Sequence, residues 1–207
     1  MALVASHWME CREAAVLAKL IASSSFVAFA VSLGATRTTF GRLVLAGLSL
    51  SWLGDMLLLG TTHGAFLSGL VAFLIAHVMY ISAFTVHCID WRRALAAAVP
   101  VGAISVFVSL WLSPYVAAPM QLPVQAYTLV ISVMLATALS TGGAGLAIPL
   151  GAALFYFSDL SVAAGQFVKP DFPNYVWGLP VYYSGQLLLA WSTRSIAQSP
   201  PGVSDNR

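Results

Sequence analysis

Residues 48–60 read LSLSWLGDMLLLG, and residues 151–165 read GAALFYFSDLSVAAG. Each stretch is apolar along most of its length but carries one aspartate, Asp55 in the first and Asp159 in the second. An ionisable group at the depth of the hydrocarbon costs about 2.5–3.5 kcal/mol unless it is paired or hydrated. The two aspartates are therefore the first candidates for a functional site.

The composition of the whole chain is typical of an integral membrane protein. Of its 207 residues, 59% are hydrophobic and 8% are charged, which leaves too little polar surface to cover a soluble globule. We expect an all-α fold, a polytopic bundle of transmembrane helices, because backbone that faces lipid must satisfy its own hydrogen bonds. Polar or Gly- and Pro-rich breaks divide the chain into seven predicted spans, each able to cross about 30 Å of hydrocarbon: 14–34, 43–60, 65–86, 94–112, 124–140, 145–167 and 175–196.

The spans form one predicted transmembrane domain, residues 1–198, followed by a polar tail, 199–207, that we expect to be disordered. Basic residues are concentrated on one face of the bundle, which predicts that this face is cytoplasmic. We therefore expect a multi-pass protein of a bacterial cytoplasmic membrane, with its N-terminus outside and its C-terminus inside. No basic run suggests nucleic acid, and nothing in the sequence predicts an oligomeric state. The basic residues on the predicted cytoplasmic face are Arg37, Arg42, Arg92, Arg93, Arg194 and Arg207, against Arg12 and Lys169 on the other.

The predicted topology brings the buried charges to one layer of the membrane. Lys19, Asp55 and Asp159 lie roughly 8 to 12 Å from the same end of the bundle, at 1.5 Å per helical residue. Other polar side chains fall in or near this layer, and His77 and Tyr80, which share a face of one helix, are expected to form its floor. We predict one shared polar cavity, whose remaining members are Tyr127, Tyr183 and Gln186.

Two carboxylates and one lysine leave an excess of negative charge, so we expect one aspartate to be protonated and the other ionised. Such a pair suits the acid-assisted cleavage of acetal-like C–O bonds. The alternative is that Lys19 and the aspartates form an ion-paired core with a structural role. Buried ion pairs contribute little to stability, because desolvation offsets most of their Coulomb attraction.

Other chemistries fit the sequence less well. His7, His63, His77 and His87 lack the spacing of a zinc or iron site, so we expect no metal and no cofactor. An intramembrane aspartyl protease needs a GxGD motif and a Tyr-Asp motif, whereas this chain has WLGD at 52–55 and FSD at 157–159. No serine lies in a G-x-S-x-G context, and Lys19 is too near the end of its span for a retinal Schiff base.

Five stretches of the chain together resemble the YhhN family of multispanning membrane proteins, whose characterised members are lysoplasmalogenases. They are LGDMLL at 53–58, FLIAHVMY at 73–80, AY at 126–127, GAALFYFSD at 151–159 and YYSGQ at 182–186. The family often has Lys-Pro where this chain has Lys19-Leu20, and often has eight helices where we count seven.

The resemblance implies hydrolysis of the vinyl ether bond of a lysoplasmalogen, with release of a fatty aldehyde and glycerophosphoethanolamine or glycerophosphocholine. The expected partners are this lysophospholipid and the membrane lipids. Protonation of the outer alkene carbon gives an oxocarbenium ion that water captures, so no cofactor is required. We expect Asp55 and Asp159 to be the catalytic acid and base, with the order unassigned. Lys19 would bind the lipid phosphate or determine which carboxyl stays ionised, and the remaining substrate-binding residues would be His77, Tyr80, Tyr127, Tyr183 and Gln186.

Two other functions stay open on the sequence. In a proton-coupled transporter the two aspartates would relay protons, although such carriers often have internal repeats and none is visible here. In a non-catalytic lipid-binding protein, the same cavity would hold a lysolipid without turning it over.

Overall fold

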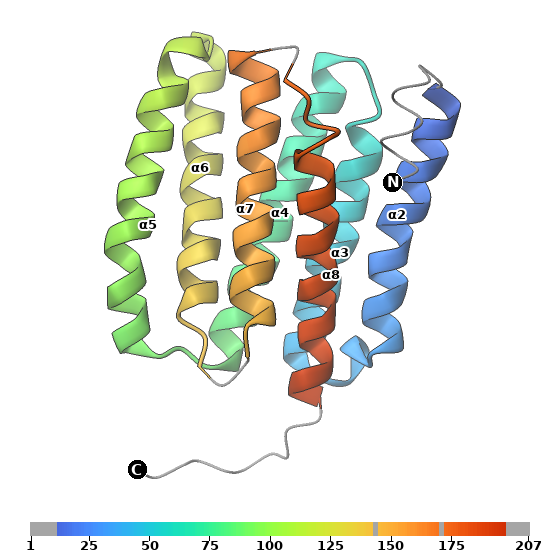
Figure 1. The fold of residues 1–207 in the computed structure, drawn as a ribbon, viewed down its shortest axis with the longest axis vertical. Helices are drawn as coiled ribbons and strands as arrows, with labels where there is room; N and C mark the ends of the chain where they lie inside the picture. The colour runs from blue at the N-terminus through green and yellow to red at the C-terminus, as the bar shows by residue number, and fades with distance from the viewer. Residues whose placement is uncertain (1–11, 143–144, 170–171, 198–207) are drawn as a thin grey trace.

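The computed structural model of the chain describes residues 12–142, 145–169 and 172–197 (Figure 1). Within these residues the fold is all-α, with seven α-helices and no β-strand, which confirms the predicted class. The predicted tail, 199–207, lies outside the described residues, and the division into domain and tail stays a prediction. The helices are α2 (Arg12–Ser32), α3 (Thr39–Leu57), α4 (His63–His87), α5 (Trp91–Leu112), α6 (Ala118–Leu139), α7 (Ala147–Ala163) and α8 (Gly178–Ala197).

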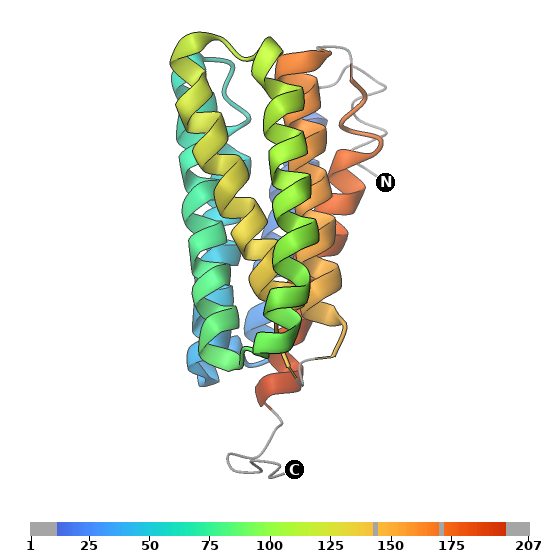
Figure 2. The same ribbon diagram turned by 90° about the vertical axis from the view of Figure 1, so that its left-hand side faces the viewer.

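The helices run alternately up and down and lie side by side in one bundle. In Figure 1, α2 and α5 lie at opposite edges, and α3 and α4 lie behind α7 and α8. Figure 2 shows α5 at the edge that faces the viewer, with α6 crossing behind it at a tilt. The most extensive packing is between α3 and α4 and between α7 and α8, whereas α5 packs mainly against α6.

Polar residues in the predicted breaks begin the helices that follow them. The Thr38 hydroxyl accepts a hydrogen bond from the backbone N–H of Gly41 (3.0 Å), and the Thr62 hydroxyl accepts one from Ala65 (3.1 Å). The Asp90 carboxylate likewise accepts two backbone N–H groups in the first turn of α5. Such caps satisfy donors that a helix N-terminus otherwise leaves free. The predicted boundaries of these helices are therefore accurate to within a few residues.

Six of the described helices, α2 to α7, have the length and composition of a membrane span. The protein is therefore an integral multi-pass membrane protein. The predicted seventh span corresponds to α8, which has 20 residues but is not among the six candidates. The reason is its polar content, which faces inward: Gln186, Ser192 and Thr193 are almost completely buried. Gln186 accepts a hydrogen bond from Tyr80 of α4, whereas Ser192 and Thr193 donate to backbone carbonyls of α8 itself.

Aromatic rings fill the centre of the bundle. Phe73 of α4, Phe155 of α7 and Tyr182 of α8 contact one another with ring centroids 5.4 to 6.2 Å apart, mostly edge to face. Aromatic pairs favour this geometry. We call these three residues the aromatic cluster, and it joins the helices that carry the polar site.

Close packing of α3 against α4 depends on glycine. A Cβ atom at Gly47 would lie 2.6 Å from the Tyr80 ring, and that ring is buried and hydrogen-bonded to Gln186. We expect Gly47→Ala to lower the free energy of unfolding by about 1–3 kcal/mol, because an overpacked core must shift. Gly102→Ala on α5 is the matched control, since a Cβ there meets nothing within 4 Å, and its effect should stay within about 0.5 kcal/mol. Thermal unfolding of the purified variants in detergent measures both, and equal midpoints would contradict the packing account.

Candidate active site

Asp55 lies near the C-terminal end of α3 and is surrounded by hydrogen-bond donors from two other helices. Lys19 Nζ of α2 is 3.3 Å from its Oδ1 atom. Ser23, one turn further along α2, donates to Oδ2 at 2.6 Å, and Tyr182 of α8 donates to the same oxygen at 2.9 Å. The side chain is only 3% exposed. Opposite charge and hydrogen-bond donors both favour the ionised form of a carboxyl group, whereas burial disfavours it.

Asp159 of α7 lies in a different environment. Tyr127 of α6 donates a hydrogen bond to its Oδ2 atom at 3.1 Å, and His77 Nε2 of α4 lies 3.2 Å from the same oxygen. The other ring nitrogen of His77, Nδ1, is 2.6 Å from the backbone oxygen of Phe73. Asp159 is thus held by groups that carry no fixed charge, whereas Asp55 is paired with a lysine.

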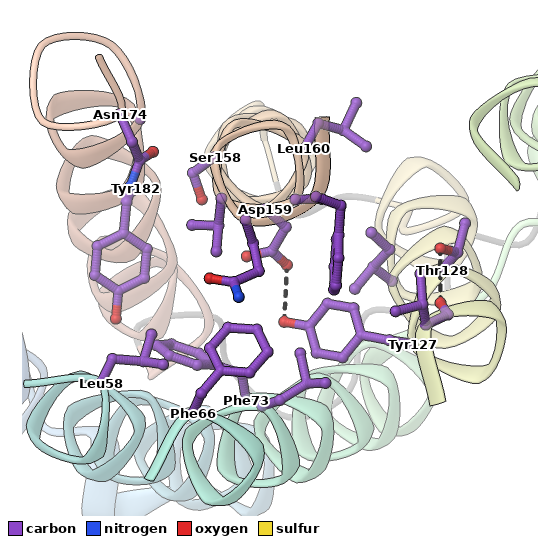
Figure 3. A pocket seen from close by; sticks show the side chains of 18 of the residues that line it. Leu58, Phe66, Phe73, Tyr127, Thr128, Ser158, Asp159, Leu160, Asn174 and Tyr182 are labelled. Atoms are coloured by element: carbon purple, nitrogen blue, oxygen red, sulfur yellow. Dashed lines mark hydrogen bonds between the residues drawn. The ribbon is translucent and has the colours of Figure 1, made fainter. Parts of the chain in front are cut away.

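Both carboxyl groups line one cavity of about 300 Å³. Figure 3 shows Asp159 and Tyr127 pointing toward one another inside it, with Tyr182 on the α8 side and Phe66 and Phe73 below. The predicted shared cavity is therefore present and includes Lys19, Asp55, Asp159 and Tyr127. Thr128, Ser158 and Asn174 add further polar groups to the lining.

The rest of the cavity wall is mostly apolar. Val108 and Leu112 of α5 and Val124 of α6 form a small buried cluster beside the acids, and Leu160 and Phe167 continue this wall along α7 and the π-helical turn that follows it, Ala164–Val168. The wall leads away from Asp159 toward the end of the bundle where Gln166 is exposed. A π-helical turn often marks a functional site. The cavity thus combines an acidic polar centre with an apolar side.

Four predicted substrate-binding residues, His77, Tyr80, Tyr183 and Gln186, are not among the residues that line the cavity. Tyr80 donates a hydrogen bond to Gln186 Oε1 at 2.8 Å, and both residues are completely buried. The Tyr183 hydroxyl lies 3.3 Å from Ser23 Oγ, so it contacts the Asp55 site indirectly. His77 is also completely buried, and it contacts the lining residues Asp159, Tyr127 and Phe73 from behind. A direct role of these residues toward a substrate stays a prediction.

Sequence reasoning missed two residues that bind Asp55. Ser23 lies one helical turn from Lys19, so it shares the face that carries the lysine, and this spacing was a usable signal. Tyr182 is adjacent to the predicted Tyr183 and lies one turn before Gln186. Two neighbouring tyrosines on a helix point in different directions, and the sequence alone does not say which one faces the acid.

In the described part of the chain, no three His, Cys, Asp or Glu side chains are arranged so that they could hold a metal ion. The expectation that the protein needs no metal or cofactor stays a prediction. In chemical terms the site offers two carboxyl groups, a lysine, an imidazole and two phenol hydroxyls.

Comparison with known proteins gives a consistent set of matches. The sequence model of the YhhN family matches residues 14–193. The chain is 29% identical to lysoplasmalogenase TMEM86A of Bos taurus over 157 residues, which are 72% of this chain and 64% of that protein. It is 31% identical to lysoplasmalogenase TMEM86B of Homo sapiens over 166 residues, 80% of this chain and 68% of the relative. The chain thus spans about two thirds of the length of these relatives, and no solved structure matches it significantly.

Removal of Lys19 should destabilise the protein strongly, because it leaves a buried carboxylate without its counter-ion. We expect Lys19→Met to cost about 3–5 kcal/mol, and Lys19→Met combined with Asp55→Asn to recover most of that loss. Arg93→Met is the matched control, since the Arg93 and Asp90 side chains form an ion pair that is 59% and 39% exposed and contributes at most about 1 kcal/mol. The variant also removes the hydrogen bond from Arg93 to the Thr141 carbonyl, which adds about 1 kcal/mol. Unfolding midpoints of the four proteins measure these effects. A double variant no more stable than Lys19→Met alone would contradict the proposed pairing.

Proposed function

The chain belongs to the YhhN family, and we propose that it is a lysoplasmalogenase, a membrane hydrolase that cleaves the vinyl ether bond of lysoplasmalogens. The names of its relatives support this activity. The observation that carries the proposal is the presence of Asp55 and Asp159 in one cavity, each with a different set of partners. Pairs of acids with different environments are the usual means of combining a general acid with a general base.

The proposed reaction uses both carboxyl groups and one water molecule. The protonated carboxyl donates its proton to the outer alkene carbon, and a lone pair of the ether oxygen forms the oxocarbenium ion. Water then bonds to the oxocarbenium carbon while the ionised carboxyl accepts one of its protons, which gives a hemiacetal. When the hemiacetal collapses, the first carboxylate takes the hydroxyl proton and the second carboxyl protonates the departing glycerol oxygen. Both groups return to their starting states, and the products are a fatty aldehyde and glycerophosphoethanolamine or glycerophosphocholine.

The mostly apolar lining of the cavity supports a lipid as substrate. Its volume is within the usual range for a small-molecule site. In this proposal the alkenyl chain lies along the apolar wall formed by Val108, Leu112 and Val124, and the head group lies toward Gln166 and Asn174. Lys19 is bonded to Asp55, which supports its role in keeping that carboxyl ionised over a role in binding phosphate.

We also propose that the cavity opens toward the outer face of the membrane. Arg37, Arg92 and Arg194 lie at one end of the described bundle, where α2, α4 and α8 end. Lys169 lies at the opposite end, between α7 and α8. An excess of basic residues in short loops is typical of the cytoplasmic side. Gln166 and Asn174 share the end that carries Lys169.

Neutral replacement of either acid should abolish turnover without removing the cavity. We expect Asp55→Asn and Asp159→Asn each to lower kcat for lysoplasmalogen by about 10²–10⁴-fold, since each removes one proton-transfer group. Asp90→Asn is the matched control, because Asp90 caps α5 and asparagine caps a helix equally well. Aldehyde release by the purified proteins measures the effect.

The assay also separates the proposal from its competitors. Full activity in both variants would refute the acid and base roles. Tight lysolipid binding by the wild type with no aldehyde formed would indicate a binding protein, and proton flux in liposomes that depends on lysolipid, with no product, would indicate a carrier.

A further inference from the structure

The protonation of one ring nitrogen of His77 follows from its partner. His77 is completely buried, and its Nδ1 atom lies 2.6 Å from the backbone oxygen of Phe73, one turn earlier on α4. A carbonyl oxygen only accepts hydrogen bonds, so Nδ1 must carry a proton. In a neutral imidazole the second nitrogen, Nε2, then has none and acts as an acceptor.

Nε2 faces Asp159, at 3.2 Å from Oδ2. If the carboxyl were ionised and the imidazole neutral, two lone pairs would face each other and a buried negative charge would lack compensation. If both groups were protonated, a buried positive charge would result. The His77 and Asp159 pair is therefore expected to hold one proton between Nε2 and Oδ2.

The surroundings favour a pair without charge, in which the proton is on the Asp159 carboxyl group and the His77 imidazole is neutral. The His77 ring packs against Phe155 with centroids 4.5 Å apart and against the Tyr127 ring at 5.6 Å. A carboxylate and an imidazolium in such apolar surroundings would both be desolvated, and this costs free energy. Tyr127 donates to Asp159 Oδ2, which is compatible with a protonated carboxyl because Oδ2 keeps a lone pair.

The Nε2 and Oδ2 atoms are close but not aligned as a hydrogen bond, and Nε2 has no other partner in the part of the chain that the structure describes. Catalytic hydrogen bonds are often poorly aligned without substrate and tighten when it binds.

We propose that His77 is a positioning residue that holds the reacting proton on Asp159, so that Asp159 is the acid and Asp55 is the ionised base. This assignment rests on the proposed lysoplasmalogenase function and goes further, because it fixes the order of the two acids. The contrast with Asp55 supports it: that carboxyl has Lys19, Ser23 and Tyr182 as donors. In this assignment Asp55 and Lys19 form one pair and Asp159 and His77 form the other, and each pair has no net charge.

The proton is conserved through the cycle. It moves from Asp159 to the outer alkene carbon, and the new C–H bond takes the electron pair of the C=C bond. Asp159 is then a carboxylate, stabilised by Tyr127, beside a neutral His77 that has no Nε2 proton to give it. Asp159 recovers its proton only from the hemiacetal hydroxyl, and this favours collapse to the aldehyde.

Two spectroscopic measurements on the purified protein test the assignment without substrate. Nitrogen-15 NMR of histidine-labelled protein at neutral pH, with His77 assigned by its loss in His77→Phe, should show a neutral ring protonated on Nδ1. Infrared spectra should show the C=O stretch of a protonated carboxyl that disappears in Asp159→Asn and persists in Asp55→Asn. A ring protonated on Nε2, an imidazolium signal, or a C=O band that depends on Asp55 would overturn the proposal. These results stand even if lysoplasmalogen proves not to be the substrate.

Kinetics supply the second test. His77→Phe keeps an aromatic ring against Phe155, and His77→Gln keeps a polar group. Both should lower kcat about 10²-fold with little change in lysophospholipid affinity. His87→Phe is the matched control on the same helix, because His87 packs against Phe40 at 5.6 Å and does not line the cavity. Wild-type kcat in both His77 variants would refute the positioning role.

Discussion

The arrangement of this bundle depends on two carboxyl groups, each of which needs polar or charged partners in an apolar environment. Asp55 on α3 receives its partners from α2 and α8, and Asp159 on α7 receives its partners from α4 and α6. Two of the seven described helices thus carry the acids, and four others supply their polar partners. The remaining helix, α5, supplies only apolar residues, Val108 and Leu112, to the same cavity. Because an uncompensated buried charge is costly, these contacts restrict how the helices rotate and pack.

The two acids have opposite surroundings, and the aromatic cluster connects them. Tyr182 donates its hydroxyl to Asp55, and its ring packs against Phe73 and Phe155. Phe73 provides the carbonyl that orients His77, and Phe155 packs on the His77 ring. The same three residues therefore contact Asp55 on one side and the imidazole partner of Asp159 on the other. The two acids therefore have different partners because of how the helices pack around them.

The sequence was sufficient for the features that depend on length, composition and topology. Apolar runs and polar breaks predicted the helices, and the alternation of direction brought Lys19, Asp55 and Asp159 to one end of the bundle. The rotation of each helix was not predictable, because apolar residues occur on all sides of a membrane helix and give no clear inward face. For this reason the sequence predicted Tyr183 as a site residue, whereas Tyr182 is the tyrosine that binds Asp55. The partners of His77 were not predictable for a related reason, since they are a carbonyl on its own helix and a carboxyl group 82 positions away in the sequence.

In the proposed reaction a carboxyl group protonates a vinyl ether carbon, and the position of solvent hydrogen in the product is a direct test of that step. The purified protein is incubated with lysoplasmalogen in heavy water, and the aldehyde is reduced at once to prevent exchange. Protonation of the outer alkene carbon should leave one deuterium at the carbon next to the carbonyl carbon. That deuterium would come from an exchanged carboxyl proton, and it should accompany every turnover. An aldehyde with no deuterium at this carbon, or a substrate left intact, would refute the proposed protonation step.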